Sequence, residues 1–125
     1  MRIFISHGMG SDPVLFETVV EALKDRLYNC WRPDLLPGDL TAAQLQDAIA
    51  THDACVFVAT ERSVASEWCK AEVAAFWGRR KPVIVYLTEE SLTKTLPPQF
   101  QGAFFARTLP EAIRALDTEW KRAMG

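Results

Sequence analysis

The sequence carries no strong charge of either sign. Sixteen acidic residues stand against fourteen basic ones, and the net charge is −2. Domains that bind nucleic acid or anionic membrane surfaces are typically basic, and this chain has no basic excess. The composition therefore predicts that neither nucleic acid nor membrane is a direct partner.

The chain also has few cysteines and no long hydrophobic run. Its three cysteines, Cys30, Cys55 and Cys69, are an odd number without a C-x-x-C pair, which argues against a disulfide framework and a zinc site. The longest apolar stretches, such as "PVIVYL", have the length of a strand, and no basic leader with a cleavage site precedes the first strand. These absences indicate a reducing, cytoplasmic compartment rather than secretion or a membrane span.

Apolar residues are abundant, in contrast, and they follow a regular pattern. They make up 49% of the 125 residues, which is enough to fill the core of one domain of common size. Strand-like runs alternate with helix-like runs, as in a parallel sheet covered on both faces. The expected strands are 2–6, about 29–32, 54–60, 82–87 and, as an edge strand, 103–106. The chain is thus predicted to form a single doubly wound α/β domain, 1–125, with a five-stranded parallel sheet and helices on both faces.

Helical spacing and capping residues predict the helices between these strands. Thr41 with Gln44, and Thr108 with Glu111, form capping boxes. The cations at 79–81 suit the negative end of the helix that precedes them. The residues expected to face the core are Phe16, Val19, Val20, Leu23 and Leu27 in the first helix and Leu109, Ile113, Leu116 and Trp120 in the last.

The carboxyl ends of the strands meet at one edge of such a sheet, and ligands bind there at the switch point in strand order. This edge carries the segments 6–10, 32–39 and 60–68. The stretch "SEWCKAE" (66–72) begins there and places Trp68 and Glu72 four residues apart, on one helix face. Without further information, such a pair is a packed aromatic beside a solvated carboxylate.

Three segments of the chain, in order, resemble the TIR (Toll/interleukin-1 receptor) domain family. "RIFISH" (2–7) resembles the family's first strand, "RPDLLPGD" (32–39) its BB loop, and "SEWCKAE" the S-x-W-C-x-x-E signature of its catalytic helix. The resemblance extends over nearly the whole chain and implies a flavodoxin-like fold. In many bacterial members the glutamate of the signature serves an NAD-cleaving activity. The resemblance therefore implies that Glu72 is catalytic and that Trp68 is its aromatic partner.

The chemistry of NAD+ is consistent with this pair of side chains. The nicotinamide of NAD+ is a cationic pyridinium that leaves as a neutral molecule, so its departure needs no general acid. An ordinary glycosidase needs two carboxylates because its leaving oxygen must be protonated. One carboxylate near the ribose can stabilise the developing oxocarbenium charge, and a tryptophan one turn away can stack on the nicotinamide. NAD+ is then a consumed substrate, and neither a cofactor nor a metal is expected.

The resemblance further implies substrate contacts from the loops at this edge. The expected substrate-binding residues are Trp68, Ser6, His7, Gly8, Arg32, Asp34 and Leu40. His7 is equally well explained as a hydrogen-bonded residue at the rim, and Arg32 and Asp34 as parts of a solvated loop. Trp31 stands where some catalytic relatives carry an acidic residue, which is a departure from the family's pattern.

The BB-like loop also carries apolar residues that suit contact with a neighbouring domain. The expected self-association residues are Leu35, Leu36, Pro37 and Gly38, in head-to-tail contacts between TIR domains that propagate as open filaments. The implied role is that of an effector in a bacterial anti-phage immune system, activated by self-association. The trigger is expected to come from a sensor domain or from a separate regulatory protein.

Other functions stay open beside the NAD-cleaving one. The first alternative is a non-catalytic TIR module that works by docking to other TIR domains. Gly8 and Gly10 invite comparison with the dinucleotide fingerprint, but Pro13 stands in place of the third glycine. A response-regulator receiver is excluded because its acidic pair and its strand-end aspartate are absent. A nucleoside deoxyribosyltransferase, which also uses a glutamate at a ribosyl carbon, is a more distant alternative.

Overall fold

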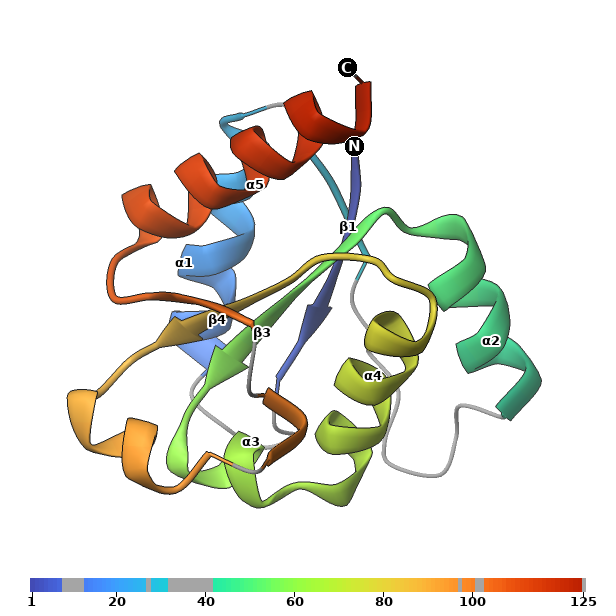
Figure 1. Cartoon of the computed structure of the whole chain (residues 1–125). Helices are drawn as coiled ribbons and strands as arrows, with labels where there is room; N and C mark the ends of the chain where they lie inside the picture. Colours follow the sequence, from blue (N-terminus) through green and yellow to red (C-terminus); the bar gives the residue numbers. More distant parts are fainter. Residues whose placement is uncertain (8–12, 27, 32–41, 97, 101–102, 125) are drawn as a thin grey trace.

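The structure, a computed structural model, describes residues 1–7, 13–26, 28–31, 42–96, 98–100 and 103–124. Within them, five parallel strands form one sheet in the order β2-β1-β3-β4-β5 (Figure 1). The strands are β1 (Arg2–Ser6), β2 (Asn29–Trp31), β3 (Ala54–Ala59), β4 (Val83–Leu87) and β5 (Phe104–Ala106). The order reverses between β1 and β3, which is the switch point of a flavodoxin-like sheet. The predicted five-stranded parallel sheet is confirmed.

Helices cover both faces of this sheet, also as predicted (Figure 1). α1 (Pro13–Lys24) and α5 (Leu109–Met124) pack on one face, and α2 (Ala42–Thr51) and α4 (Glu67–Gly78) pack on the other. The short elements α3 (Glu61–Ala65) and η1 (Glu90–Lys94) follow the carboxyl ends of β3 and β4, and η2 (Pro98–Phe100) packs against α4. None of the described helices is long and apolar enough to cross a membrane.

The central strands are apolar because both of their faces are buried. All residues of β3, and all of β1 except Arg2, are buried, as expected of parallel strands between two layers of helices. One core, which includes Phe57 and Phe76, lies on the side of α2 and α4. The other, which includes Val19 and Leu116, lies on the side of α1 and α5. Packing on both faces of the sheet therefore fixes the positions of the strands whose carboxyl ends form this edge.

The helical segment between β3 and β4 is divided into α3 and α4. Thr60 and Ser63 cap the start of α3 reciprocally, each side chain bonding the backbone N–H of the other. Ser66 then leaves the helical conformation, with φ −78° and ψ 119°, and its Oγ accepts the N–H of Cys69 at 3.2 Å. A serine in this role caps a new helix. The first serine of "SEWCKAE" thus sets where α4 begins.

The cations at the end of α4 do not act together as the sequence predicts. Lys81 caps α2 instead: its Nζ donates to the carbonyl oxygens of Ile49 (2.6 Å), Ala50 (3.2 Å) and His52 (2.7 Å). The side chain of Lys81 thus bonds the end of α2, while its backbone N–H donates to the carbonyl oxygen of Phe76 in α4 at 3.0 Å. The end of α4 is formed by Arg80, whose φ of 56° lies in the left-handed region.

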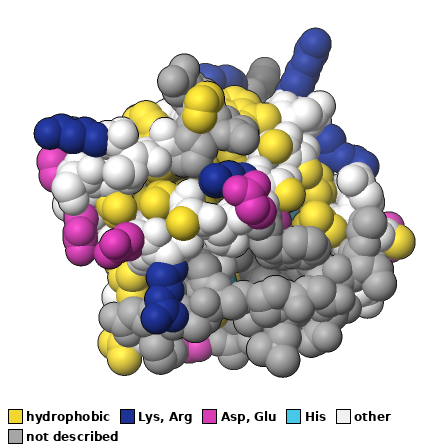
Figure 2. Space-filling model, turned by 90° about the horizontal axis from the view of Figure 1, so that it is seen from below, with side chains coloured by type: hydrophobic (Ala, Val, Ile, Leu, Met, Phe, Trp, Pro, Cys, Tyr) yellow, Lys and Arg dark blue, Asp and Glu magenta, His cyan; other side chains and the backbone are white. Residues whose placement is uncertain are grey.

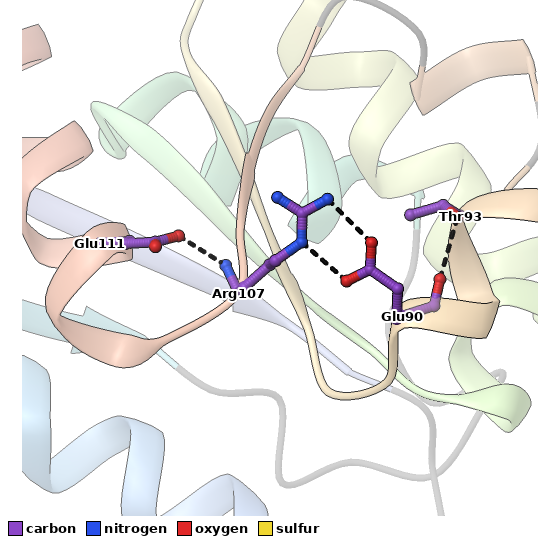
Figure 3. Close-up of polar contacts among 4 residues, drawn as sticks. All are labelled: Glu90, Thr93, Arg107 and Glu111. Atoms are coloured by element: carbon purple, nitrogen blue, oxygen red, sulfur yellow. Dashed lines mark hydrogen bonds and ion pairs between the residues drawn. The ribbon is translucent and has the colours of Figure 1, made fainter.

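The last helix begins at the predicted Thr108–Glu111 capping pair, with one variation. Thr108 Oγ1 accepts the N–H of Glu111 at 3.2 Å, but the Glu111 carboxylate accepts the N–H of Arg107 at 2.9 Å (Figure 3). The Arg107 guanidinium makes two further hydrogen bonds to the Glu90 carboxylate, of 2.7 and 2.9 Å. Arg107 therefore joins the start of α5 to η1, so the loops that follow β4 and β5 are connected.

The predicted face of α5 lies against the core, with different degrees of burial. Leu116 is fully buried as expected, Leu109 and Ile113 are half-buried and pack against the same core, and Trp120 is half-buried. The residues buried beside Leu116 are Ala112 and Ala115. Small side chains at these positions let the helix lie close to the sheet, and the larger ones cover the margin of the contact.

A polar cluster joins α5 to the segment before β2. Asp117 accepts hydrogen bonds from the Tyr28 hydroxyl and from the Arg26 guanidinium. Burial and the bond to Asp117 raise the pKa of Tyr28 to about 12. The same Tyr28 bond, and after it Arg26, hold the pKa of Asp117 below its usual value. The cluster ties the last helix to the edge of the sheet farthest from β5.

Candidate active site

Glu72 is a buried carboxylate on the sheet-facing side of α4. Only 1% of its surface is exposed, and it shares this face with Cys69, Val73 and Phe76, which are buried to the same degree. These three neighbours belong to the apolar core of the α2 and α4 side. A charged group in such surroundings is costly unless it is paired and hydrogen-bonded. Its presence is therefore not explained by packing.

Ser6 supplies a hydrogen bond to this carboxylate. It is the last residue of β1, it is fully buried, and its Oγ donates to Glu72 Oε1 at 2.8 Å. Ser6 is aligned with Phe57 of β3, so the bond lies where β1 and β3 run side by side. This is the switch point of the sheet. The two sequence segments that predicted a site, "RIFISH" and "SEWCKAE", therefore meet here.

Two buried thiols lie near the carboxylate, one on β3 and one on α4. Desolvation raises the pKa of both Cys55 and Cys69, and the negative charge of Glu72 raises both further. Both cysteines are free. A thiol whose pKa is raised stays protonated and is a poor nucleophile or metal ligand. Cys69, the cysteine of the signature, is therefore buried and unreactive, and Cys55 is a neighbour of the site that the sequence did not reveal.

His7 follows Ser6 at the end of β1. Its ring is half-buried and stacks on Phe16 of α1, with 4.0 Å between the ring centroids and 30° between the planes. This position at the margin of the site suits a rim residue. His7 also lies next to Ser6 in the chain, at the edge of the sheet where the sequence predicts that it contacts the substrate.

Trp68 lies on α4 one turn before Glu72, as the signature predicts, but its side chain belongs to the part that the structure does not describe. The other predicted site residues lie outside the described residues. They are Gly8, Arg32, Asp34 and Leu40 of the expected substrate pocket and Leu35, Leu36, Pro37 and Gly38 of the expected self-association loop. Within the described ranges, no group of three or more histidine, cysteine, aspartate or glutamate side chains is placed to hold a metal ion.

The surface at the carboxyl edge is mixed in character (Figure 2). Among the described side chains on this face, lysine and arginine are interspersed with aspartate and glutamate, and hydrophobic side chains lie between them. The described part of this face thus offers no extended patch of one sign to a polyanion.

Sequence reasoning found both members of the central pair but not the contact between them. Ser6 was noticed because it ends an apolar strand at the ligand-binding edge, and Glu72 because it belongs to the signature. Cys55 gave no such signal, since a cysteine within a fully apolar strand is ordinary core filling.

Comparison with solved structures identifies the same fold in other proteins. A metazoan TIR-STING receptor from C. gigas matches with a TM-score of 0.72 and 24% identity over 91% of this chain, which covers only 39% of that chain. The CMP N-glycosidase BcmB of Clostridium botulinum matches with a TM-score of 0.58 and 15% identity, over 95% of this chain and 99% of that one. The TIR domains of the activated Roq1 resistosome, which recognises the pathogen effector XopQ, match with a TM-score of 0.57 and 15% identity, over 94% and 70%.

These identities are low enough that the likeness concerns the fold alone. Comparison with curated protein sequences gives no match. The family model for the TIR domain, however, matches residues 3–121, which include β1, the switch point and the whole of α4. The chain belongs to the TIR domain family.

Proposed function

We propose that this TIR domain is an NAD+ glycohydrolase, with Glu72 as its catalytic carboxylate. The observation that carries the proposal is the position of Glu72, 1% exposed on the signature helix and hydrogen-bonded to Ser6 at the switch point. A glutamate with only a structural role would be expected on the solvent face of α4. A carboxylate kept at the ligand-binding edge, inside an apolar face, is better explained by chemistry that needs a negative charge there.

The reaction would break the bond between ribose C1′ and the nicotinamide nitrogen. The electron pair of this bond goes to the ring nitrogen, so nicotinamide leaves uncharged and needs no proton. The positive charge then develops on the ribose, and the Glu72 carboxylate stabilises it. In hydrolysis, water bonds to C1′ and releases a proton, which gives linear ADP-ribose. In cyclisation, a nucleophilic group of the same ADP-ribose takes the place of water.

The remaining pocket residues would bind the substrate around this centre. Trp68, one helical turn before Glu72, would stack on the nicotinamide and shield the reacting bond from bulk water. His7 and Gly8 would line one side, and Arg32, Asp34 and Leu40 the other, while Ser6 lies behind Glu72 and bonds it. The position of His7 directly after Ser6, at the margin of the site, supports this arrangement.

One structural relative acts on a bond of the same class. BcmB is a CMP N-glycosidase, so a protein with this fold cleaves a bond between a ribose carbon and a base nitrogen. The leaving base of CMP is uncharged before cleavage, whereas nicotinamide in NAD+ is cationic. Glu72 is the one buried carboxylate among the described residues, and a site with a single carboxylate suits the cationic leaving group better, because that group departs without protonation. NAD+ is therefore the substrate we assign.

We also propose that self-association activates the enzyme in an immune response. Edge strand β5 exposes 52% of Phe104 and 38% of Phe105, and Phe104 lines a cleft of about 280 Å³ beside α5. An exposed apolar edge of this kind suits docking to another chain. The BB-like loop, with Leu35, Leu36, Pro37 and Gly38, would supply the complementary surface. The Roq1 TIR domains belong to an activated resistosome, which supports assembly as the mode of activation.

The proposed setting is bacterial anti-phage defence, with a sensor domain or a separate regulatory protein as the trigger. The chain of the TIR-STING receptor is longer than this one, which covers 39% of it. The competing function is a non-catalytic TIR module that only docks to other TIR domains. The same exposed phenylalanines support that alternative, so assembly by itself does not separate the two.

A nicotinamide-release assay separates them. The protein is concentrated, incubated with NAD+, and the products are resolved by chromatography, with CMP as a second substrate and a folded Glu72→Gln variant as the control. We expect nicotinamide and linear or cyclic ADP-ribose from NAD+, no cytosine from CMP, and no product from the variant. Assembly without any release of nicotinamide would favour the docking module.

A further inference from the structure

The Ser6–Glu72 contact joins a rigid element to a flexible side chain. Ser6 ends β1 and is aligned with Phe57 of β3, and residues 2–4 of the same strand also pair with β2, so the position of its backbone is fixed by the sheet. The Glu72 side chain has three rotatable bonds and sits on a helix. Ser6 Oγ lies 2.8 Å from Glu72 Oε1, and both residues are almost completely buried. The rigid partner therefore determines where the flexible one points.

The burial of Ser6 indicates what its hydroxyl contacts. The residue has no exposed surface, and the hydroxyl hydrogen is directed to the carboxylate, which can only accept. A hydroxyl used in this way cannot at the same time donate to a ribose oxygen. The neighbouring thiols of Cys55 and Cys69 are weaker hydrogen-bond donors, so the Ser6 hydroxyl is the strongest donor of the three side chains.

We propose that Ser6 is the positioning residue of the active site: it acts on catalysis through Glu72 and does not contact NAD+. This inference rests on the proposed catalytic function of Glu72. A preorganised charge stabilises a transition state without reorganising during the reaction. The hydrogen bond from Ser6 supplies this preorganisation by holding one carboxylate oxygen in a fixed place. The sequence alone predicted a substrate contact for Ser6, and the geometry assigns it a different role.

A kinetic experiment distinguishes positioning from substrate contact. Ser6→Ala is expected to lower kcat for NAD+ cleavage by about 10- to 100-fold, the loss typical of a misplaced catalytic group, with KM within about twofold of wild type. Ser6→Cys has a side chain of similar size and a weak hydrogen-bond donor. Its kcat is expected to lie between that of wild type and that of Ser6→Ala. Rates are normalised to the folded fraction measured by circular dichroism. A raised KM with unchanged kcat would show that Ser6 binds the substrate, and would overturn the proposal.

A thermodynamic cycle tests the contact without any use of activity. The unfolding midpoint is measured for Ser6→Ala, for Glu72→Leu and for the double variant. Each single change leaves a buried polar group without its partner, whereas the double change removes both partners together. We therefore expect Ser6→Ala to lower the midpoint in the wild-type background but not in the Glu72→Leu background. Additive shifts would refute the coupling.

Ser63→Ala provides a matched control for this cycle. Ser63 is also fully buried, and its hydroxyl donates to the carbonyl oxygen of Val58 at 2.7 Å. Its destabilising effect is expected to be the same in the wild-type and Glu72→Leu backgrounds. The kinetic experiment and the thermodynamic cycle also show which of the two proposals has failed. Absence of NAD+ cleavage by the wild type would reject the proposed function, whereas an additive cycle or a KM effect would reject the role of Ser6.

Discussion

Glu72 lies one helical turn after Cys69 on the buried face of α4, and each residue exposes only 1% of its surface. One face of a single helix thus packs the core and carries the candidate catalytic group. The site and the core share residues, because Val73 and Phe76 on the same face belong to the core. A variant in this region must therefore be judged by its folding as well as by its activity.

Glu72→Gln is expected to abolish NAD+ cleavage in a folded protein. Glutamine keeps the size, the helix propensity and an oxygen that can accept the Ser6 hydroxyl, but it lacks the negative charge. Removing one electrostatic stabiliser of a transition state typically costs about 10²–10³ in kcat. The measurement is nicotinamide release, with the melting temperature as the folding control. Wild-type turnover by a folded variant would rule out the assignment.

Trp68 is expected to contribute stacking and not stability. Trp68→Ala should weaken catalysis strongly and Trp68→Phe less so, since aromatic stacking is worth about 0.5–1.5 kcal/mol beyond area burial. Trp77 provides the matched control on the same helix, because it is half-buried and packs against the core. Trp77→Ala should lower the melting temperature with little loss of activity per folded molecule. If Trp68→Ala instead lowers the melting temperature strongly, that tryptophan belongs to the core.

The sheet and its helices could be predicted because the pattern of apolar residues is local. The run 54–60 is apolar except for Thr60, and β3 within it is fully buried. The division between α3 and α4 could not be predicted, because "SVASEW" contains no proline or glycine to mark it. The role of Lys81 was also hidden, since its acceptors on α2 lie about thirty positions earlier in the chain. Long-range contacts leave no periodic signal.

The candidate site was predictable to the same degree. The signature identified Glu72, and the end of the first apolar run identified Ser6. Their mutual hydrogen bond depends on how α4 crosses β1 and β3, which no spacing in the sequence specifies. The sequence pattern therefore finds residues, and the packing of helix on sheet decides which of them touch.

Lys81→Met is expected to destabilise the fold by removing the cap of α2. The ammonium donates to three carbonyl oxygens, and burial lowers its pKa from the usual value. Hydrogen bonds to charged groups contribute about 1.5 kcal/mol or more, so a loss of that order is expected in the free energy of unfolding by urea. Arg79→Met is the control, because Arg79 is exposed and bonds only Gln46 among the described side chains; its effect should stay within about 0.5 kcal/mol. Equal effects would contradict the capping role.

Asp117 is expected to make the fold sensitive to acid. Its folded-state pKa is held below the usual value, first by the hydrogen bond from Tyr28. A carboxylate of this kind stabilises the fold above its unfolded pKa of about 3.9, and the stabilisation is lost as the pH falls through the lower folded value. The melting temperature of wild type should therefore fall more steeply than that of Asp117→Asn below about pH 4. Tyr28→Phe should reproduce part of this difference, and parallel curves for all three proteins would disprove it.

The last prediction is that the isolated domain is nearly inactive when dilute and becomes active by self-association. An NAD+-consuming enzyme that was always active would harm its own cell, so its geometry should be incomplete in the monomer. The loop 32–40 contains Leu35, Leu36 and Leu40, and edge strand β5 exposes Phe104 and Phe105. Contact between two such different surfaces is head-to-tail, and contacts of this type propagate as open filaments unless the rotation closes a ring. Assembly would then shift the population toward the active arrangement.

Specific activity per molecule should therefore rise with protein concentration, in parallel with the mass measured by light scattering. Leu36→Asp in the loop and Phe104→Asp on β5 should each abolish the rise, because each places a charge in one half of the contact. Val14→Asp is the matched control: Val14 is an exposed apolar residue of α1, with 71% of its surface accessible, and it belongs neither to the loop 32–40 nor to β5. The specific activity of Val14→Asp should rise with protein concentration as that of wild type does, because the loss of an exposed apolar side chain elsewhere does not disrupt a specific contact. Activity strictly proportional to enzyme concentration, from a protein that stays monomeric, would show that the single domain is already complete and that its control lies elsewhere.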